Sequence, residues 1–195
     1  MYHKHHTNGI VLGSRFEGEH NKIIQIFTKD FGLVSVKAQA VRGSQSKLRM
    51  ACQDFSVGNF SLLVGRNSWK LVGAESIKNI FEELKYSEKK LNVVSNIFRL
   101  IKRLVGESEP NMELFMILDN FFDFLIKTEE EFASLAECLV LLKILHNLGY
   151  MRNDPELSIP MSSLEIAITD LEKIAPKRSH IVNLINESIK ATNLT

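Results

Sequence analysis

The spacing of the hydrophobic residues changes near residue 80, and this change decides which elements the chain can form. Before that point, short apolar runs alternate with polar residues and are separated by glycine-containing turns, the pattern of β-strands. After it, apolar residues recur every three or four positions, as in LNVVSNIFRLIKRLV at 91–105, the pattern of amphipathic helices. We therefore predict a β domain at residues 1–80 and an all-helical domain at residues 81–195.

The β domain is predicted to contain five strands. Both faces of the strand segments are partly apolar, which favours a small closed barrel over an open sheet. Gly32 suits the turn of a tight hairpin, while Gly58 and Gly73 lie inside strand patterns and predict bulges or sharp bends. The strand segments are GIVLGSRF (9–16), the hairpin NKIIQIFTKDFGLVSVKAQA (21–40), DFSVGNFSLLV (54–64) and SWKLVGAESI (68–77).

The pattern of residues 81–195 predicts a helical bundle, because the apolar stripe of each helix must be covered by another helix. Two Ser/Thr-x-x-Glu patterns are typical of the capping box that opens a helix. The further helices are expected at 111–127, from a box at Thr128 and Glu131 to Gly149, from a box at Ser162 and Glu165 onward, and at 178–195.

Composition narrows the class of protein. With 45% hydrophobic and 24% charged residues among 195, the chain resembles an ordinary globular protein, and it has no apolar run long enough for a membrane span. We expect the polar start, which includes HKHH, to be a mobile terminus, and we see no secretory signal. Cys52 and Cys138 stand far apart without a CxxC pattern, so neither zinc nor a disulfide is predicted and a cytoplasmic location fits.

Charge is divided unevenly along the chain. Residues 1–80 contain 11 Lys and Arg against 5 Asp and Glu, whereas residues 81–195 contain 13 against 18. The basic half concentrates its cations between residues 37 and 49, around a Gly-Ser-Gln-Ser segment. A small barrel with a cationic connection is suited to binding a phosphate backbone, and a solvated surface loop is the plain alternative.

Catalytic chemistry has weaker support. We find no pattern of a nucleophile with its base, of a zinc protease or of a phosphate-binding loop. Glu17, Glu19, His20 and Asp30 could ligate a metal in a nuclease, although a solvated loop is the favoured interpretation. Phe16, Phe31 and Trp69 are candidates for base stacking, with packing in the core or at its rim as the alternative.

The stretch from 18 to 56 resembles the amino-terminal signature of the bacterial DNA repair protein RecO family. An acid precedes a strand that ends in Phe27-Thr28, Gly32 makes the turn, and a basic connection leads to Gln53-Asp54-Phe55-Ser56. The connection carries Ser46-Lys47-Leu48-Arg49. Later, FASLAECLVLLKILHNLGY is similar to a family helix that ends in Leu-Gly-Tyr.

The resemblance implies an α+β fold, with an OB-fold barrel followed by a helical domain. It also implies a recombination mediator rather than an enzyme, one that binds single- and double-stranded DNA, anneals complementary strands and, with RecR, helps RecA load on DNA coated by the single-strand-binding protein SSB. Such a protein works in the cytoplasm, at the nucleoid. The residues expected to contact DNA are Arg15, Lys22, Lys37, Arg42, Lys47 and Arg49.

The chain also departs from the family pattern. Many members place a four-cysteine zinc module after Leu-Gly-Tyr, but MRNDPELSIPMSS follows Tyr150 here and contains no cysteine. Neither zinc nor another cofactor is therefore implied, and the chain looks like a short variant of the family. The alternative to a DNA-binding mediator is a protein–protein interaction module that docks the SSB tail or RecR and binds little DNA itself.

Overall fold

The computed structural model describes residues 3–39, 41, 48–65, 68–151, 157, 161 and 163–192. Two of the six predicted DNA-binding cations, Arg42 and Lys47, lie outside the described residues. The chain divides into two compact units, residues 1–83 with 100–112, and residues 84–99 with 113–195. The predicted domains met at residue 80. The structure instead groups the later segment 100–112 with the β-strands.

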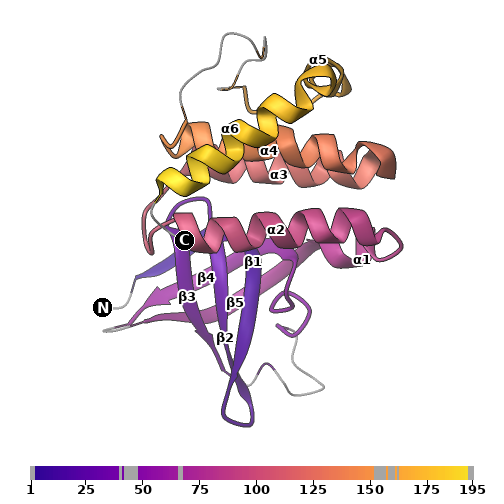
Figure 1. Cartoon of the computed structure of the whole chain (residues 1–195). Coiled ribbons are helices and arrows are strands. Elements are labelled where there is room, and N and C mark those ends of the chain that lie inside the picture. The colour runs from indigo at the N-terminus through magenta and orange to yellow at the C-terminus, as the bar shows by residue number, and fades with distance from the viewer. Residues whose placement is uncertain are drawn as a thin grey trace. The chain divides into compact units, whose positions relative to one another are not determined.

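The first unit is a closed five-stranded barrel (Figure 1). Its strands are β1 (Lys4–Glu17), β2 (Asn21–Thr28), β3 (Gly32–Ala38), β4 (Ser56–Val64) and β5 (Trp69–Asn79). They follow the order β1-β2-β3-β5-β4 around the barrel, with β3 and β5 parallel and the other pairs antiparallel. This is the OB-type barrel of the predicted α+β fold.

Alternation along the strands fills the barrel. Val34, Val36 and Ala38 point into the core, and Ser35 and Lys37 between them face outward. The ladder between β4 and β5 shifts register next to Gly58 and again opposite Gly73, where bulges were expected. These shifts let the strands curve far enough to close the barrel.

The first strand begins earlier than predicted. Lys4, His5 and His6 belong to β1 and pair with Leu63, Leu62 and Ser61 of β4. The expectation of a mobile polar terminus was therefore wrong for these residues. The ladder with β4 uses their backbone hydrogen-bonding groups, which outweighs the unfavourable composition of the segment.

The segment that follows α2 (Glu88–Leu104) is joined to the start of β3. The Ser108 N–H donates to the Leu33 carbonyl at 2.8 Å, and Glu107 forms a parallel bridge with Leu33. Gly32 has a φ of +67°, and a Cβ there would lie only 2.0 Å from the Glu109 carbonyl oxygen. Glycine is needed at this position for both reasons.

The helical region contains α1 (Ile80–Leu84), α2, α3 (Met112–Lys127), η1 (Glu130–Phe132), α4 (Ala133–Asn147), α5 (Ile168–Ile174), η3 (Ala175–Lys177) and α6 (Arg178–Ala191). Within the second unit, α4 contacts both α5 and α6. Buried leucines, isoleucines and phenylalanines of α3 and α4 form its core. In the described part of the chain, no helix is both long enough and apolar enough to span a bilayer.

The first predicted capping box is wrong. Thr128 continues the end of α3, where its N–H donates to the Phe124 carbonyl, and the ammonium of Lys90 donates to its carbonyl oxygen. Its hydroxyl is buried and has no hydrogen-bond partner among the described residues. Thr128 therefore belongs to the C-terminal end of α3 and does not cap α4. A 3-10 turn at Glu130–Phe132 leads into α4 instead.

The helix expected from Ser162 begins later. Ser162 lies outside the described residues, residues 163–167 are not helical, and α5 starts at Ile168. The Lys143 ammonium donates to the Ser163 carbonyl at 2.6 Å, and the Asn120 amide donates to the Leu164 carbonyl at 3.0 Å. Because side chains of α4 and α3 already satisfy these carbonyls, the segment can remain extended.

Candidate nucleic-acid interface

Four of the predicted cations lie at one end of the barrel, where β1 and β3 finish and β2 begins. The cross-strand register separates them into two groups, because paired residues project from the same face of a sheet. Arg15 pairs with Ile23, which pairs in turn with Lys37, and these residues face outward. Phe16 pairs with Lys22, which pairs with the core residue Ala38, so this second group faces the end of the barrel interior.

The outward group continues across the barrel as a cation row, defined by Arg15, Lys37, Lys70 and Lys4. Lys37 pairs with Lys70 of β5, Lys70 pairs with Leu63 of β4, and Leu63 pairs with Lys4 at the start of β1. Since neighbouring strands lie about 4.8 Å apart, the four cationic positions follow a path that winds around the closed barrel from one end of β1 to the other, with backbone spacings of about 5–10 Å. The row presents positive charge along a path rather than at a point.

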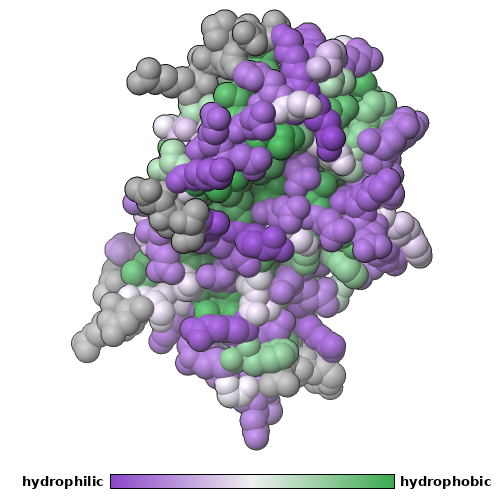
Figure 2. All heavy atoms as spheres, viewed as in Figure 1, coloured by the Kyte–Doolittle hydropathy of each residue, from purple (hydrophilic) through white to green (hydrophobic). Residues whose placement is uncertain are grey.

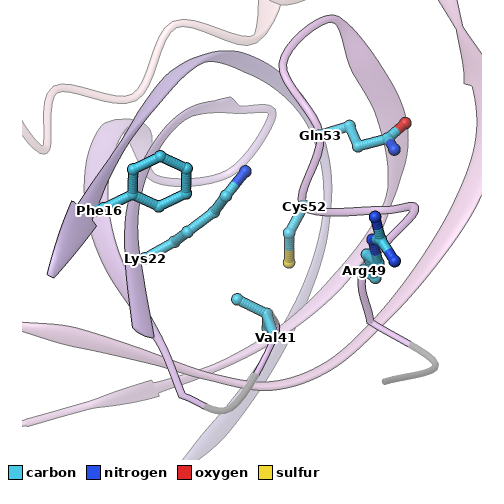
Figure 3. A pocket seen from close by; sticks show the side chains of 6 residues that line it. All are labelled: Phe16, Lys22, Val41, Arg49, Cys52 and Gln53. Carbon is cyan, nitrogen blue, oxygen red and sulfur yellow. The ribbon is translucent and has the colours of Figure 1, made fainter. Parts of the chain in front are cut away.

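The inward group lines an end cavity of about 350 Å³, together with the connection that precedes β4 (Figure 3). Its lining residues are Phe16, Lys22, Val41, Arg49, Cys52 and Gln53. The Lys22 ammonium extends into the middle of the cavity, next to the Phe16 ring, whose centroid is 5.5 Å away. Arg49 and Gln53 lie on the opposite side (Figure 3). The cavity thus combines two cations with an exposed aromatic ring.

Arg49 is positioned by turns that pack on the barrel. The Cys52 N–H donates to the Leu48 carbonyl at 3.0 Å, and the Ser56 hydroxyl donates to the Met50 carbonyl at 2.9 Å. Cys52 belongs to the barrel core, and Leu48 packs against it. Arg49 remains exposed between these anchored neighbours, so its guanidinium is held near the cavity while staying accessible.

Two electrostatic features adjust the site. Lys37 forms an ion pair with Glu17 at 2.5 Å, and both side chains are about one-third exposed. Such exposed pairs contribute little stability, about 0–1 kcal/mol, so a phosphate can compete with the carboxylate. At the base of the cavity, burial raises the pKa of the Cys52 thiol to about 11, although nearby Lys22 lowers it slightly. The thiol therefore stays neutral near pH 7.

A second, polar groove lies on the outer face of the same strands. Arg15 lines it with Lys102, and Glu107 and Asp54 also contribute. Ser35 donates from its hydroxyl to Glu107 at 3.4 Å, and Ser14 donates to Asp54 at 2.6 Å. These two carboxylates neutralise part of the positive charge beside the cation row, so the surface around Arg15 is not uniformly positive. Figure 2 shows one face of the molecule, on which hydrophilic side chains cover most of the barrel.

The metal-binding hypothesis is wrong for the proposed set of ligands. Glu17 lies at the far end of β1 and pairs with Asn21, whereas Asp30 lies in the turn at the opposite end of β2. Asp30 accepts a hydrogen bond from the Thr7 hydroxyl at 2.7 Å, and Glu17 is paired with Lys37. In the described part of the chain, no three His, Cys, Asp or Glu side chains are grouped to hold a metal.

The three aromatic candidates are in different surroundings. Phe31 and Trp69 pack on the barrel core, with ring centroids 5.0 Å apart and His5 against both. Phe16 has 66% of its surface exposed and lines the end cavity. Of the three, only Phe16 lines the cavity in which the cations Lys22 and Arg49 lie.

Sequence reasoning missed Lys4, Lys70, Lys102 and Gln53. Lys70 joins the row only because β3 and β5 pair in parallel when the barrel closes. Local periodicity contains no information on such a non-local contact. The signal available was the predicted OB topology, which brings the start of the fifth strand beside the third.

Comparison with known proteins agrees with this architecture. Residues 1–80 match the family model "Recombination protein O N terminal". The chain is 30% identical over 145 residues to the DNA repair protein RecO of Caldanaerobacter subterraneus subsp. tengcongensis, covering 74% of this chain and 58% of that protein. It is 31% identical over 147 residues to that of Clostridium acetobutylicum, covering 75% and 59%. The chain belongs to the RecO family.

The match to the RecO family extends beyond the barrel into the helices. The RecO protein of Alkaliphilus metalliredigens is 30% identical over 135 residues, covering 69% of this chain and 54% of that protein. The chain therefore spans slightly more than half of the length of these relatives. The cation row and the end cavity both lie within the barrel of residues 1–80, the part matched by the RecO amino-terminal model.

Proposed function

We propose that this protein binds DNA through the cation row and the end cavity, and that it brings complementary strands together during DNA repair and recombination. The observation that carries the proposal is the register of Arg15, Lys37 and Lys70, which lines up positive side chains on the outer face of an OB-type barrel. The relatives named as DNA repair proteins support the same process.

Electrostatics explains how strand annealing can proceed without a catalytic group. Two nucleic-acid strands repel one another, and a cationic surface that holds both weakly reduces that repulsion and raises their local concentration. Base pairing then supplies the specificity and the driving force. We accordingly propose a mediator and not an enzyme with a turnover step, acting in the cytoplasm at the nucleoid.

The family resemblance supports a set of protein partners. We propose RecR and SSB as direct partners and RecA as an indirect one, since a mediator must hand over strands that SSB coats. The helical unit is the candidate for partner docking. Its composition differs from that of the barrel unit, with 11 Lys and Arg against 14 Asp and Glu, compared with 13 against 9.

A double variant tests the role of the cation row. Replacing Lys37 and Lys70 with alanine removes the two adjacent cations at its centre. We expect weaker binding of single-stranded DNA at low salt, and a slope of log affinity against log salt that is smaller by about 1.4, because each phosphate contact contributes about 0.7. Fluorescence anisotropy with a labelled oligonucleotide across a salt series measures both quantities.

Lys29→Ala is the matched control. Lys29 lies in the turn between β2 and β3, at the other end of β3 from Lys37, so its removal lowers the net charge by the same unit per residue without removing a cation of the row. The control should keep the wild-type salt slope. An unchanged slope in the double variant, or an equal effect of Lys29→Ala, would show that the row does not bind DNA.

A further inference from the structure

We propose that the end cavity binds one unpaired nucleobase, with guanine preferred. This inference rests on the proposed DNA-binding function but concerns a different surface from the cation row. The row can hold phosphates of any strand, whereas the end cavity has a shape and chemistry suited to a base. A paired base in a duplex is stacked between its neighbours and cannot enter.

The floor of the end cavity is apolar, and its walls are polar. Val41 and Cys52 are 2% and 1% exposed and belong to the barrel core. Lys22 points into the cavity from the side of Phe16, and Gln53 lies across from it (Figure 3). A nucleobase has apolar faces and a polar edge, which matches this division. A phosphate group would gain nothing from the apolar residues on the cavity floor.

The Phe16 ring offers a stacking surface at the cavity entrance. It is 66% exposed at the end of β1. Bases stack on such rings in single-stranded nucleic-acid sites, and the stacking tolerates any base because every base has a π face. At about 350 Å³, the cavity is at the lower end of the range for small-molecule sites, so it suits one base.

The polar groups explain the preference for guanine. Lys22 and Arg49 carry only hydrogen-bond donors, and Gln53 can donate through its amide. Among the described residues, neither Arg49 nor the side chain of Gln53 has a hydrogen bond or an ion pair. Guanine presents two acceptors, O6 and N7, on one edge, whereas adenine places a donor beside its N7. Arg49 and Gln53, on the side of the cavity opposite Phe16, can donate to both of these acceptors, which favours guanine over adenine.

Synthetic strands made of abasic residues separate base binding from phosphate binding. Each strand carries the same phosphates and either one central guanine, one central adenine or no base. We expect the full-length chain to bind the guanine strand about tenfold more tightly than the strand with no base, with adenine between them, in fluorescence anisotropy titrations. Equal affinity for all three strands would overturn the proposal.

Two variants locate the effect. Phe16→Ala should remove the difference between base-carrying and abasic strands while leaving affinity for the abasic strand unchanged. Arg49→Gln should reduce the ratio of guanine to adenine affinity but retain stacking. Phe81→Ala is the control, since Phe81 is 44% exposed in the same unit and does not line the end cavity. A guanine preference that survives Phe16→Ala would place the base elsewhere and overturn the proposal.

Small ligands provide an independent measurement by nuclear magnetic resonance. Deoxyguanosine monophosphate should shift the resonances of Phe16 and Gln53, and deoxyribose 5-phosphate should leave them unmoved. Shifts of the same size with both ligands would assign the cavity to phosphate instead. If no strand binds at all, the proposed DNA-binding function fails as well, whereas equal binding of all strands rejects only the base site.

Discussion

Lys37 already has a carboxylate partner, which a DNA phosphate would have to displace in the proposed function. Glu17 lies 2.5 Å from the Lys37 ammonium, and both side chains are about one-third exposed. In the proposed function, single-stranded DNA would therefore compete with an intramolecular anion at the centre of the cation row. Such competition would keep binding weak and reversible, which suits the proposed annealing, since a strand held too tightly could not search for its complement.

Removing that competitor should strengthen DNA binding. We expect Glu17→Gln to raise the affinity for single-stranded DNA up to about fivefold at low salt, because an exposed ion pair is worth about 0–1 kcal/mol. Anisotropy titration measures the effect, and thermal unfolding checks that the fold is retained. Glu75→Gln removes the same charge from an exposed site on β5 and serves as the control. Equal gains in both variants would indicate net charge instead of release of Lys37.

The residue scale also shows what a sequence can and cannot predict. The outward orientation of Lys37 and the inward orientation of Val36 can be read from the sequence, because both follow from the period of one strand. The partner of Lys37 could not be predicted in the same way. Glu17 reaches it from β1, across β2, and Lys70 approaches it only through closure of the barrel. Contacts between distant strands depend on register, which local patterns do not contain.

At the scale of elements, two glycines distinguish the cost of a left-handed backbone from the cost of a close contact. Gly18 and Gly32 both have positive φ values, +66° and +67°. A Cβ at Gly18 would meet nothing within 4 Å, whereas one at Gly32 would lie 2.0 Å from the Glu109 carbonyl oxygen. Comparing substitutions at Gly18 and Gly32 therefore separates the packing of the segment after α2 against β3 from the cost of the left-handed backbone.

Alanine at these two glycines should have very different effects on the free energy of unfolding. We expect Gly18→Ala to lose about 1–2 kcal/mol, the usual cost of a left-handed alanine. Gly32→Ala should lose about 3 kcal/mol or more, because the carbonyl of Glu109 must also move. Urea denaturation measures both. Similar losses at the two positions would show that the segment after α2 is not packed closely on β3 in solution.

The helical unit contains a buried lysine that should make its stability depend on pH. Lys143 of α4 is 1% exposed, and burial lowers the pKa of its ammonium below the ordinary 10.5, with Asp170 opposing the shift. The folded state therefore holds this proton less tightly than the unfolded state does. As pH rises from the lowered pKa towards 10.5, the unfolded state carries more protons, so the free energy of unfolding rises.

Replacing the buried lysine should remove this rise. We expect Lys143→Met to gain less stability than the wild type between neutral pH and about pH 10.5, whatever its stability at neutral pH. Lys173→Met is the control, because Lys173 is half-exposed and contacts the same Asp170 at 3.3 Å. Urea denaturation at several pH values gives the comparison. Parallel curves for the wild type and Lys143→Met would exclude a buried charge at this position.

Capping boxes were the least reliable signal at this scale. A Ser/Thr-x-x-Glu pattern predicts that a helix begins there. In this chain, however, the Thr128 N–H bonds to the last turn of α3 and its carbonyl accepts from Lys90. Strands were predicted better than helix starts, since five alternating segments must close around one core. Helix ends depend on a few hydrogen bonds, which side chains from elsewhere can replace.

At the scale of the molecule, charge divides between the two units. The barrel unit has 13 Lys and Arg against 9 Asp and Glu, and the helical unit has 11 against 14. The barrel unit is thus better suited to a polyanion than the helical unit, which agrees with the proposal that DNA and protein partners bind to separate surfaces. The uneven charge was visible in the sequence, whereas the assignment of 100–112 to the barrel unit was not.

A protein that acts only through charge and a protein that also docks on SSB behave differently on coated strands. SSB occupies the phosphates that the cation row would bind, so a simple cationic protein should accelerate annealing of naked complementary strands and fail on coated ones. We expect this chain to anneal both, with Lys37→Ala/Lys70→Ala slowing the reaction on naked strands and Lys29→Ala leaving it unchanged. Fluorescence annealing assays give the rates. If the full chain anneals naked strands but not coated ones, DNA binding stands while SSB docking through this part of the protein is excluded.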